Sequence, residues 1–413
     1  MYLFYSQELL TIDTGVASND NLGQDVALSG DAQVMAVGAH LVDLNGLYNV
    51  GHVRLYSKNG MDWNMCQQID GPPLSNNNFG YSVDLSHNGS TLAVSALYYA
   101  VYFYELSNIT DRYELLDTTA IIQAREVSVS GDGSTVGVTS TFVSRGARIF
   151  ARIGNVFQQR GSTFSGYGYV SGIALNYNGT IAAIGQRNWA TSRGRVGVFQ
   201  LTDAKNGDWM QMGSYISGDA ASNYFGDHGC VSITHEGLTI AVGAWGYNGD
   251  GGDKGLVRVY NYVTTENTWE MSLDLVGDNS YDYLSTTSLS SDGKFLIAGA
   301  WGGNYIKILE KIGSNYEIVG EKVTSGEGGY FGGSVDMSAD MTAVAIGAYR
   351  FNNYKGRAYL LVSNNLANSP SSVSVNETSS FLSTIPSFAP NTSSLSIPLS
   401  PHLSGNGNGG MYP

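Results

Sequence analysis

Residues 331–348 read FGGSVDMSADMTAVAIGA, and residues 79–96 read FGYSVDLSHNGSTLAVSA. Both stretches contain an apolar strand, a Ser-x-Asp or Ser-x-Asn turn, and a second apolar strand that ends in Gly-Ala or Ser-Ala. Asp, Asn and Gly suit a tight hairpin turn because they adopt positive φ angles at little steric cost. Each stretch therefore predicts an antiparallel β-hairpin.

This hairpin recurs seven times along the chain, at intervals of about 50 residues. We expect the hairpins near residues 22–39, 79–96, 123–140, 169–186, 225–244, 283–300 and 331–348. Two more strand signals follow most hairpins: an apolar run such as 255–260 (GLVRVY), and a run opened by an aromatic residue such as Trp63 or Trp269. Four-stranded repeats of this length are typical of propeller blades. The chain is therefore predicted to be all-β and to fold as a seven-bladed β-propeller.

The seventh repeat lacks its fourth strand, but the other end of the chain offers one. Residues 6–15 (SQELLTIDTG) resemble residues 63–71 (WNMCQQIDG), which form a fourth strand in the first repeat. We expect the segment from about Ser6 to Asp13 to pair beside Arg357–Leu361 and close the ring, which removes exposed sheet edges. Residues 363–413 hold 14 serines and six of the 8 prolines. The predicted organisation is thus a propeller over residues 1–362 and a disordered tail over 363–413.

Charge and composition exclude several classes of protein. The chain carries 21 Lys and Arg against 35 Asp and Glu, a net charge of −14, so we expect no nucleic-acid partner. Cys66 and Cys230 are the 2 cysteines, too few for a disulfide scaffold. No apolar run approaches the roughly 20 residues of a membrane helix. The first residues show no basic segment followed by an apolar one, so no signal peptide is visible.

The Phe-Gly pairs at 79–80, 225–226 and 331–332, with later Gly-Ala pairs such as 347–348, resemble FG-GAP repeats. Those repeats build the seven-bladed propeller of integrin α subunits, and the chain is most similar to the FG-GAP-like propellers of microalgae with an F-G-x-S-V-x-L-S-x-D-G motif. The resemblance implies a non-enzymatic, adhesion-like protein at the cell surface or outside the cell. Integrin-type repeats also place a D-x-D-x-D-G calcium loop between the hairpin strands. Here that loop has shrunk to segments such as 131–133 (GDG), which offer one carboxylate, so calcium at this position is not expected.

An aromatic residue or histidine follows the second hairpin strand in several repeats. His40, Trp245, Trp301 and Tyr349 occupy this place, and Tyr98 and Trp189 lie close to it in two other repeats. In a propeller the loops after this strand emerge on one face, so these side chains are predicted to gather around one rim. Trp and Tyr offer rigid amphipathic area to a protein or sugar ligand. The alternative interpretation, that they pack under their own loops and brace neighbouring blades, is favoured for an isolated aromatic residue.

The longest loop of this kind, residues 245–254, contains three oxygen-bearing side chains at short spacing. Asn248, Asp250 and Asp253 could hold calcium in a Gly-rich loop. Three ligands beside Lys254 fall short of the six to eight oxygens that calcium takes, so a plain flexible loop is favoured. We therefore expect no cofactor, with calcium at this loop as the alternative.

Asp84 and Asp336 occupy equivalent positions in two hairpins and are predicted to face the central channel, bound to backbone amides or water. No nucleophile–base motif occurs, so the expected function is that of a monomeric interaction propeller. The alternative is a hydrolase or lyase with an acidic site in the channel. Asn108, Asn376 and Asn391 begin Asn-x-Ser/Thr sequons and are candidate glycosylation sites, with an unmodified polar segment as the alternative for the tail.

Overall fold

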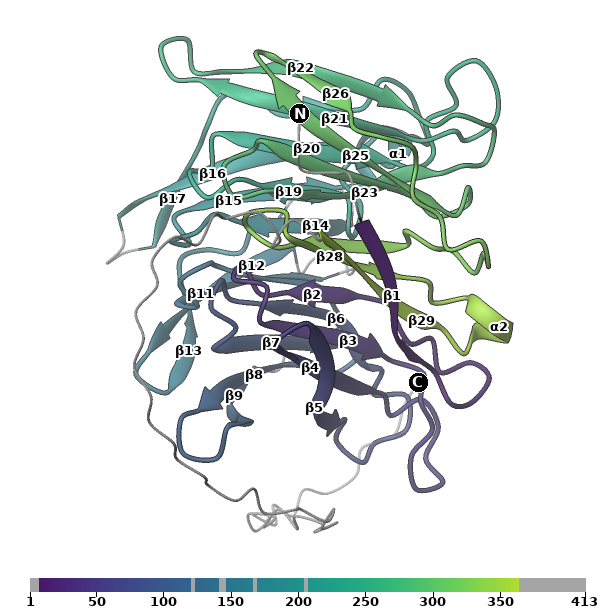
Figure 1. Ribbon diagram of the computed structural model, residues 1–413. Coiled ribbons are helices and arrows are strands. Elements are labelled where there is room, and N and C mark those ends of the chain that lie inside the picture. Colours follow the sequence, from purple (N-terminus) through teal and green to yellow (C-terminus); the bar gives the residue numbers. More distant parts are fainter. Residues whose placement is uncertain (1–6, 120–122, 141–145, 166–168, 204–206, 364–413) are drawn as a thin grey trace, which may run out of the picture. The chain divides into compact units, whose positions relative to one another are not determined.

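The computed structural model describes residues 7–119, 123–140, 146–165, 169–203 and 207–363. These residues form seven antiparallel sheets of four strands, six of them in sequence order and the seventh completed by β1, with one extra short strand on the fourth sheet (Figure 1). The predicted seven-bladed propeller is therefore confirmed. We call the strands of a blade A to D, from the innermost strand outward.

The strands of the first three blades follow the predicted repeats. Blade 1 contains β2 (Val26–Leu28), β3 (Val34–Ala39), β4 (His52–Asn59) and β5 (Asp62–Asp70). Blade 2 contains β6 (Phe79–Leu85), β7 (Thr91–Ala96), β8 (Ala100–Ser107) and β9 (Arg112–Thr119). Blade 3 contains β10 (Ala124–Val129), β11 (Thr135–Ser140), β12 (Ala147–Ile153) and β13 (Val156–Gln159).

The next three blades repeat the pattern. Blade 4 contains β14 (Val170–Leu175), β15 (Ile181–Gln186), β16 (Arg195–Asp203) and β17 (Asp208–Gln211), and β18 (Ile216–Ser217) pairs with β16. Blade 5 contains β19 (Val231–Ile233), β20 (Thr239–Ala244), β21 (Leu256–Val263) and β22 (Thr268–Val276). Blade 6 contains β23 (Leu284–Leu289), β24 (Phe295–Ala300), β25 (Tyr305–Ile312) and β26 (Asn315–Ile318).

The seventh blade joins the two ends of the described chain. It contains β27 (Ser334–Met337), β28 (Ala343–Gly347), β29 (Arg357–Ser363) and, as its outermost strand, β1 (Gln7–Thr14). β1 pairs with β29 antiparallel from Gln7 opposite Ser363 to Thr14 opposite Arg357, as Figure 1 shows where the purple strand lies along the yellow-green one. The predicted closure is confirmed, with the strand displaced by one residue from the expected start and end.

Closure also fastens blade 7 to blade 1 through one carboxylate. Asp13, at the end of β1, accepts a hydrogen bond of 2.7 Å from Nη1 of Arg54 on β4 and another from the hydroxyl of Tyr56. The Arg54 side chain is 12% exposed and that of Asp13 is 24% exposed, so most of the ion pair is shielded from water. The first described strand therefore holds two neighbouring blades together.

Buried aromatic residues fill the spaces between blades. Phe79, Phe225 and Phe331 are fully buried, and each packs in a cluster that draws on two successive blades. The glycine that follows each of them has a positive φ angle. A side-chain carbon at Gly80 would lie 2.5 Å from the carbonyl oxygen of His52, on strand C of the preceding blade. The Phe-Gly pair thus sets how closely two blades approach.

The turns between strands A and B form a second ring of contacts. Each of the seven turns makes one backbone hydrogen bond to the turn of the next blade, with N···O distances of 2.9 to 3.2 Å. The ring runs from Asp31 to His87 and closes where the amide of Ala339 in blade 7 donates to the carbonyl of Gly30 in blade 1. These bonds tie all seven blades together at this end of the molecule.

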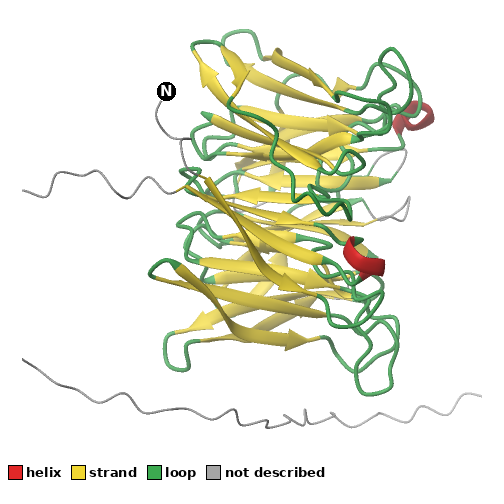
Figure 2. Cartoon of the chain, turned by 45° about the vertical axis from the view of Figure 1, so that its right-hand side comes forward, coloured by secondary structure: helices red, strands yellow, loops and turns green. Residues whose placement is uncertain are grey.

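Two one-turn helices lie in the loops between strands B and C, α1 (Trp189–Ser192) in blade 4 and α2 (Phe351–Tyr354) in blade 7. Figure 2 shows both on the same side of the blades. No helix within the described ranges is long and apolar enough to cross a membrane. The chain divides into Met1–Ala367 and Asn368–Pro413. The second unit, and with it the predicted tail beyond Ser363, lies outside the described residues.

Candidate functional site

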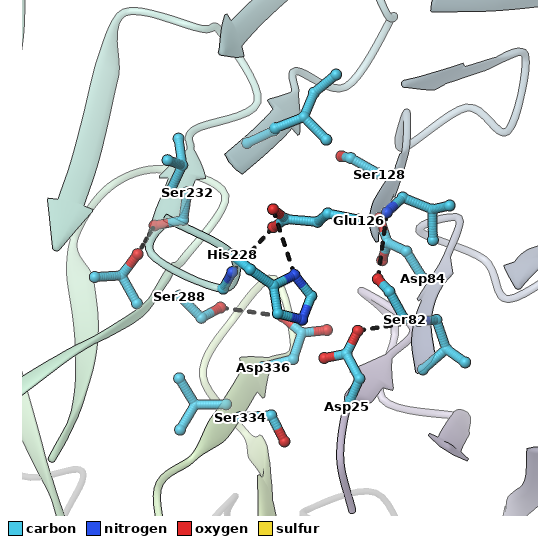
Figure 3. A pocket seen from close by; sticks show the side chains of 18 of the residues that line it. Asp25, Ser82, Asp84, Glu126, Ser128, His228, Ser232, Ser288, Ser334 and Asp336 are labelled. Carbon is cyan, nitrogen blue, oxygen red and sulfur yellow. Dashed lines mark hydrogen bonds and ion pairs between the residues drawn. The ribbon is translucent and has the colours of Figure 1, made fainter. Parts of the chain in front are cut away.

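The inner strands surround a central cavity of about 210 Å³ (Figure 3). Alternate residues of a strand share a face, so each strand A sends up to two side chains toward it. Most of them are small or acidic: the hydroxyl-bearing residues Ser82, Ser128, Ser232, Thr287, Ser288 and Ser334, and the acids Asp25, Asp84, Glu126 and Asp336. We call the end of this channel at the A–B turns the lower mouth and the opposite end the upper mouth.

The aspartates of the channel join neighbouring blades. One carboxylate oxygen of Asp84 accepts a 2.6 Å hydrogen bond from the amide of Val129 in the next blade, and the other accepts one from Leu85. Asp336 likewise binds the amide of Leu28 at 2.8 Å across the ring closure. The prediction that Asp84 and Asp336 bind backbone amides is therefore confirmed. Asp25, which the sequence reading missed, does the same with Val83 at 3.0 Å.

Burial changes the acidity of these groups. It raises the pKa of Asp336 to about 6, although the amides of Leu28 and Met337 act in the opposite direction. Burial also raises the pKa of Asp84, and the nearby charge of Asp336 adds to this effect. Burial disfavours the charged form of a carboxyl group, so both acids bind a proton more readily than an exposed aspartate does.

Glu126 and His228 form an acid–imidazole pair in the same cavity. Nδ1 of His228 lies 3.5 Å from Oε2 of Glu126, and the amide of Gly229 donates to Oε1 at 3.2 Å. Burial alone would lower the pKa of His228, but the carboxylate of Glu126 outweighs it and the pKa is raised. Burial raises the pKa of Glu126. Glu126 and His228 therefore form a buried ion pair without a direct hydrogen bond.

At the lower mouth, three aromatic rings lie together. The ring centroids of Tyr177 and His235 are 4.7 Å apart, and those of His87 and His235 are 5.4 Å apart. Two glycines make room for them: a side-chain carbon at Gly30 would lie 2.0 Å from Nδ1 of His87, and one at Gly131 would lie 2.2 Å from the ring of Tyr177. The cluster lines a second cavity of about 150 Å³ together with Asp84 and Asp336.

At the upper mouth, Asp227 gathers two arginines and an indole. Its Oδ2 accepts hydrogen bonds from Nη1 of Arg187 at 2.8 Å and from Nε1 of Trp245 at 3.1 Å. Nη2 of Arg125 lies 3.8 Å from Oδ1. Burial would raise the pKa of Asp227, but the charges of Arg125 and Arg187 outweigh it and the pKa is lowered. One ionised carboxylate therefore serves two guanidinium groups.

An unbroken array of rings extends from this point over blades 5 to 7, and we call it the aromatic array. It runs in the order Tyr224, Trp245, Tyr283, Trp301, Tyr330 and Tyr349. Two pairs, Tyr224 with Trp245 and Tyr283 with Trp301, stack with centroids 4.1 Å apart and planes within 5°. Arg187 lies 5.4 Å from the Tyr224 ring at one end, and Arg350 lies 4.3 Å from the Tyr330 ring at the other. All six rings are partly exposed.

Three tyrosines of the array have an unfavourable backbone. Tyr224, Tyr283 and Tyr330 have φ angles of 54°, 51° and 64°, in the left-handed region that bulky residues rarely adopt. Blades 1 and 2 place Asn21 and Asn78 at the same position, with φ of 55° and 56°, and asparagine tolerates this conformation well. Asparagine would adopt this backbone conformation at lower cost. We therefore infer that these positions hold tyrosine because of what its side chain does. Strain of this kind concentrates at functional sites.

The residues predicted for one rim take three different places. Trp245, Trp301 and Tyr349 lie in the array, where they also contact the tyrosines of neighbouring blades. Trp189 packs under Arg195, whose guanidinium carbon is 4.9 Å from its ring, and Tyr98 is 47% exposed outside the array. His40 is only 6% exposed and packs edge-on against Tyr81, and burial lowers its pKa to about 3. His40 therefore does not belong to the exposed surface that was expected.

The remaining predicted sites are placed as follows. In the loop 245–254, Asp250 forms an ion pair of 2.6 Å with Lys254, and Asn248 accepts a hydrogen bond from the amide of Asp253. Across the described ranges, no three His, Cys, Asp or Glu side chains meet as a metal site requires. Asn108 is exposed in the turn between β8 and β9. Asn376 and Asn391 lie outside the described residues.

Comparison with known proteins identifies the fold alone. No family model matches the chain, and no curated protein matches it either. Among solved structures, the β-propeller domain of Cps50 (Swd1) from Myceliophteria thermophila is similar at a TM-score of 0.57 and 11% identity, covering 86% of this chain and 99% of that one. The hydrazine synthase of Kuenenia stuttgartiensis is similar at a TM-score of 0.59 and 12% identity, covering 89% and 100%. Both place the chain among propellers, and at these identities neither transfers a function.

Proposed function

We propose that the protein is a non-enzymatic interaction propeller that binds a protein or glycan ligand through the aromatic array. The observation that carries this proposal is the set of three tyrosines held at left-handed φ angles. Aromatic rings on a rigid frame provide contact area at low entropic cost, which is why Tyr and Trp dominate binding surfaces. Propellers generally mediate protein interactions, so the coarse role agrees with the fold.

The Phe-Gly motifs support a finer assignment to the FG-GAP-like propellers. With that assignment come a monomeric propeller, an adhesion-like role and a place at the cell surface or outside the cell. The exposure of Asn108 makes its sequon accessible to a glycosyltransferase, in keeping with such a location. No cofactor forms part of the proposal.

The test compares two aromatic substitutions at opposite ends of the channel. Trp301→Ala removes the centre of the array, whereas Tyr177→Ala removes a ring at the lower mouth. A glycan array and pull-down from cell-surface extracts should detect a ligand for the wild-type protein and for Tyr177→Ala, and a loss of about tenfold or more in affinity for Trp301→Ala. Equal binding by both variants, or no ligand for a folded wild-type protein, would contradict the proposal.

One observation keeps a hydrolase or lyase as the second candidate. Glu126 and His228 approach within 3.5 Å in the channel, and such a pair can exchange a proton with a substrate. The wild-type protein and Glu126→Gln would be incubated with oligosaccharides and the products followed by mass spectrometry. Turnover that Glu126→Gln abolishes would favour this candidate over a pure binding role, and absence of turnover on every substrate would eliminate it.

A further inference from the structure

Arg125 at the upper mouth has almost no partners. Its side chain is 22% exposed, yet within the described ranges it makes no hydrogen bond, and its buried Nε has no partner at all. Its nearest carboxylate, Asp227, lies 3.8 Å away, beyond hydrogen-bond distance. A guanidinium carries five N–H donors, and buried donors are nearly always satisfied. The terminal nitrogens of Arg125, which make no hydrogen bond within the described ranges, are therefore the donors open to a ligand.

The charge around Arg125 tells which sign that ligand has. Arg125 and Arg187 share the ionised carboxylate of Asp227, and Glu126, whose charge also acts on Arg125, is paired with His228. The two guanidinium groups therefore outnumber the one carboxylate that they share. Arg187 is held in place by its bond to Asp227 and by a 3.0 Å hydrogen bond from Nε to Asn188. Arg187, fixed by these bonds, and the guanidinium of Arg125 beside it offer N–H donors that a planar carboxylate fits with paired hydrogen bonds. The acids of the adjoining channel disfavour a doubly charged phosphate, so a single carboxylate is the better match.

The surroundings favour a sugar as the carrier of that carboxylate. Tyr81, Tyr224 and Trp245 all lie beside the two arginines: Tyr81 is close enough for both guanidinium groups to affect its pKa, Arg187 faces Tyr224, and Trp245 shares Asp227. Tyr81 stacks on His228 and Tyr224 stacks on Trp245, and the partly exposed indole of Trp245 offers apolar surface for the C–H side of a sugar. The adjoining cavity of about 210 Å³ is lined by hydroxyl and carboxyl groups, shown in Figure 3, which can exchange hydrogen bonds with sugar hydroxyls.

We propose that Arg125 and Arg187 form a carboxylate subsite at the upper mouth, and that its ligand is a uronate residue of a glycan. This inference rests on the proposed binding function of the upper face and narrows it to acidic glycans. Arg125 supplies the paired hydrogen bonds, Arg187 supplies the second charge, and the neighbouring rings support the sugar.

The experiment measures binding of the full chain to oligogalacturonate and to oligoalginate by calorimetry. Fully methyl-esterified oligogalacturonate, which has the same sugar without the charge, is the matched ligand control. We expect the free acid of at least one uronate to bind about tenfold or more tighter than the ester, because charge-assisted hydrogen bonds are lost in the ester. Binding should weaken as salt is raised.

Three substitutions on blade 3 locate the effect. Arg125→Gln should abolish the preference for the acid, and Arg125→Lys, which keeps the charge but loses the fork, should restore only part of it. Arg152→Gln removes a charge of blade 3 that pairs with Glu105 of blade 2, away from the upper mouth, and it should change nothing. If Arg125→Gln fails to fold by its melting curve, Arg187→Gln gives the same measurement.

Each adverse result has its own meaning. Equal affinity for acid and ester, or an unchanged preference in Arg125→Gln, overturns the subsite. Binding of poly-glutamate as tight as that of the uronates overturns the assignment to a sugar. If neither uronate binds but a ligand that depends on Trp301 is found, the subsite fails while the proposed function stands. If no ligand of any kind binds the folded protein, both fail.

Discussion

Replacing Asp13 by alanine should destabilise the closed ring more than replacing an exposed aspartate on another outermost strand. The substitution leaves Arg54, only 12% exposed, without its ion pair, and leaves the buried hydroxyl of Tyr56 without an acceptor. Breaking a fully buried pair costs about 3 to 5 kcal/mol, and an exposed pair contributes less than about 1 kcal/mol. With side chains 12% and 24% exposed, we expect a loss of about 3 kcal/mol, counting the hydroxyl.

Such a loss can be measured by thermal unfolding. An unfolding entropy of about 2.1 cal/mol/K per residue over about 360 residues converts about 3 kcal/mol into a drop of about 4 °C in Tm. Asp62→Ala is the matched control, because Asp62 is an exposed aspartate at the start of β5. It should shift Tm by less than about 1 °C.

A double substitution separates the charge from the packing. Adding Arg54→Met to Asp13→Ala removes the unpaired guanidinium, so the double variant should recover about half of the lost stability. If Asp13→Ala melts within about 1 °C of Asp62→Ala, the carboxylate does not fasten blade 7 to blade 1, and the reasoning about closure is wrong.

Three further predictions concern the frame. Deleting residues 1–14 should lower Tm by many degrees, because β29 becomes a bare edge. Deleting residues 364–413, which are rich in Ser and Pro, should leave Tm nearly unchanged, and equal curves would contradict the closure. Gly80→Ala should cost about 1 to 3 kcal/mol in chemical denaturation, because φ is 85° and the added carbon would lie 2.5 Å from a carbonyl oxygen; a neutral result would mean that the blades can separate freely. The third follows from Asp336, whose pKa rises to about 6 in the fold: between about pH 4 and 6 the folded state keeps a proton that the unfolded state loses, so stability falls as pH rises. Asp336→Asn should flatten this part of the stability profile by about 1 to 3 kcal/mol between pH 4 and 8, and a profile parallel to that of the wild type would contradict it.

The sequence was sufficient for the elements and their order because each blade is encoded locally. The A–B turns carry their own hairpin chemistry, and the residue pattern of β1 fits only a fourth strand. The roles of Asp84 and Asp336 could also be foreseen, since the repeat places them on the channel side of strand A.

Contacts between blades could not be foreseen, because they depend on how two repeats are displaced against each other. Asp25 lies two residues earlier in its repeat than Asp84, so the alignment gave no sign that it too binds the next blade. Glu126 and His228 come from blades 3 and 5 and meet only in the channel. The tyrosines at 224, 283 and 330 did carry a signal: they stand directly before the buried residue where blades 1 and 2 have Asn21 and Asn78. A large residue at a position suited to asparagine could have marked the aromatic array from the sequence.

The two ends of the channel differ in backbone strain and in unpartnered hydrogen-bond donors. This difference helps to distinguish a structural role from a binding role. At the lower mouth, the backbone of His87, Tyr177 and His235 has ordinary negative φ angles. Gly30 and Gly131, which have no side chain, leave room for the rings of His87 and Tyr177. There the seven backbone hydrogen bonds already tie the blades together, and the hydroxyl of Ser291 adds one more bond to the next turn. At the upper mouth, Tyr224, Tyr283 and Tyr330 have unfavourable backbone conformations, and the Nε of Arg125 has no hydrogen-bond partner within the described ranges. A surface that only braced its blades would gain stability from asparagine at those positions and from a paired arginine. The strained tyrosines and the unpartnered arginine occur at the same end of the channel. This is the strongest reason to seek the ligand there.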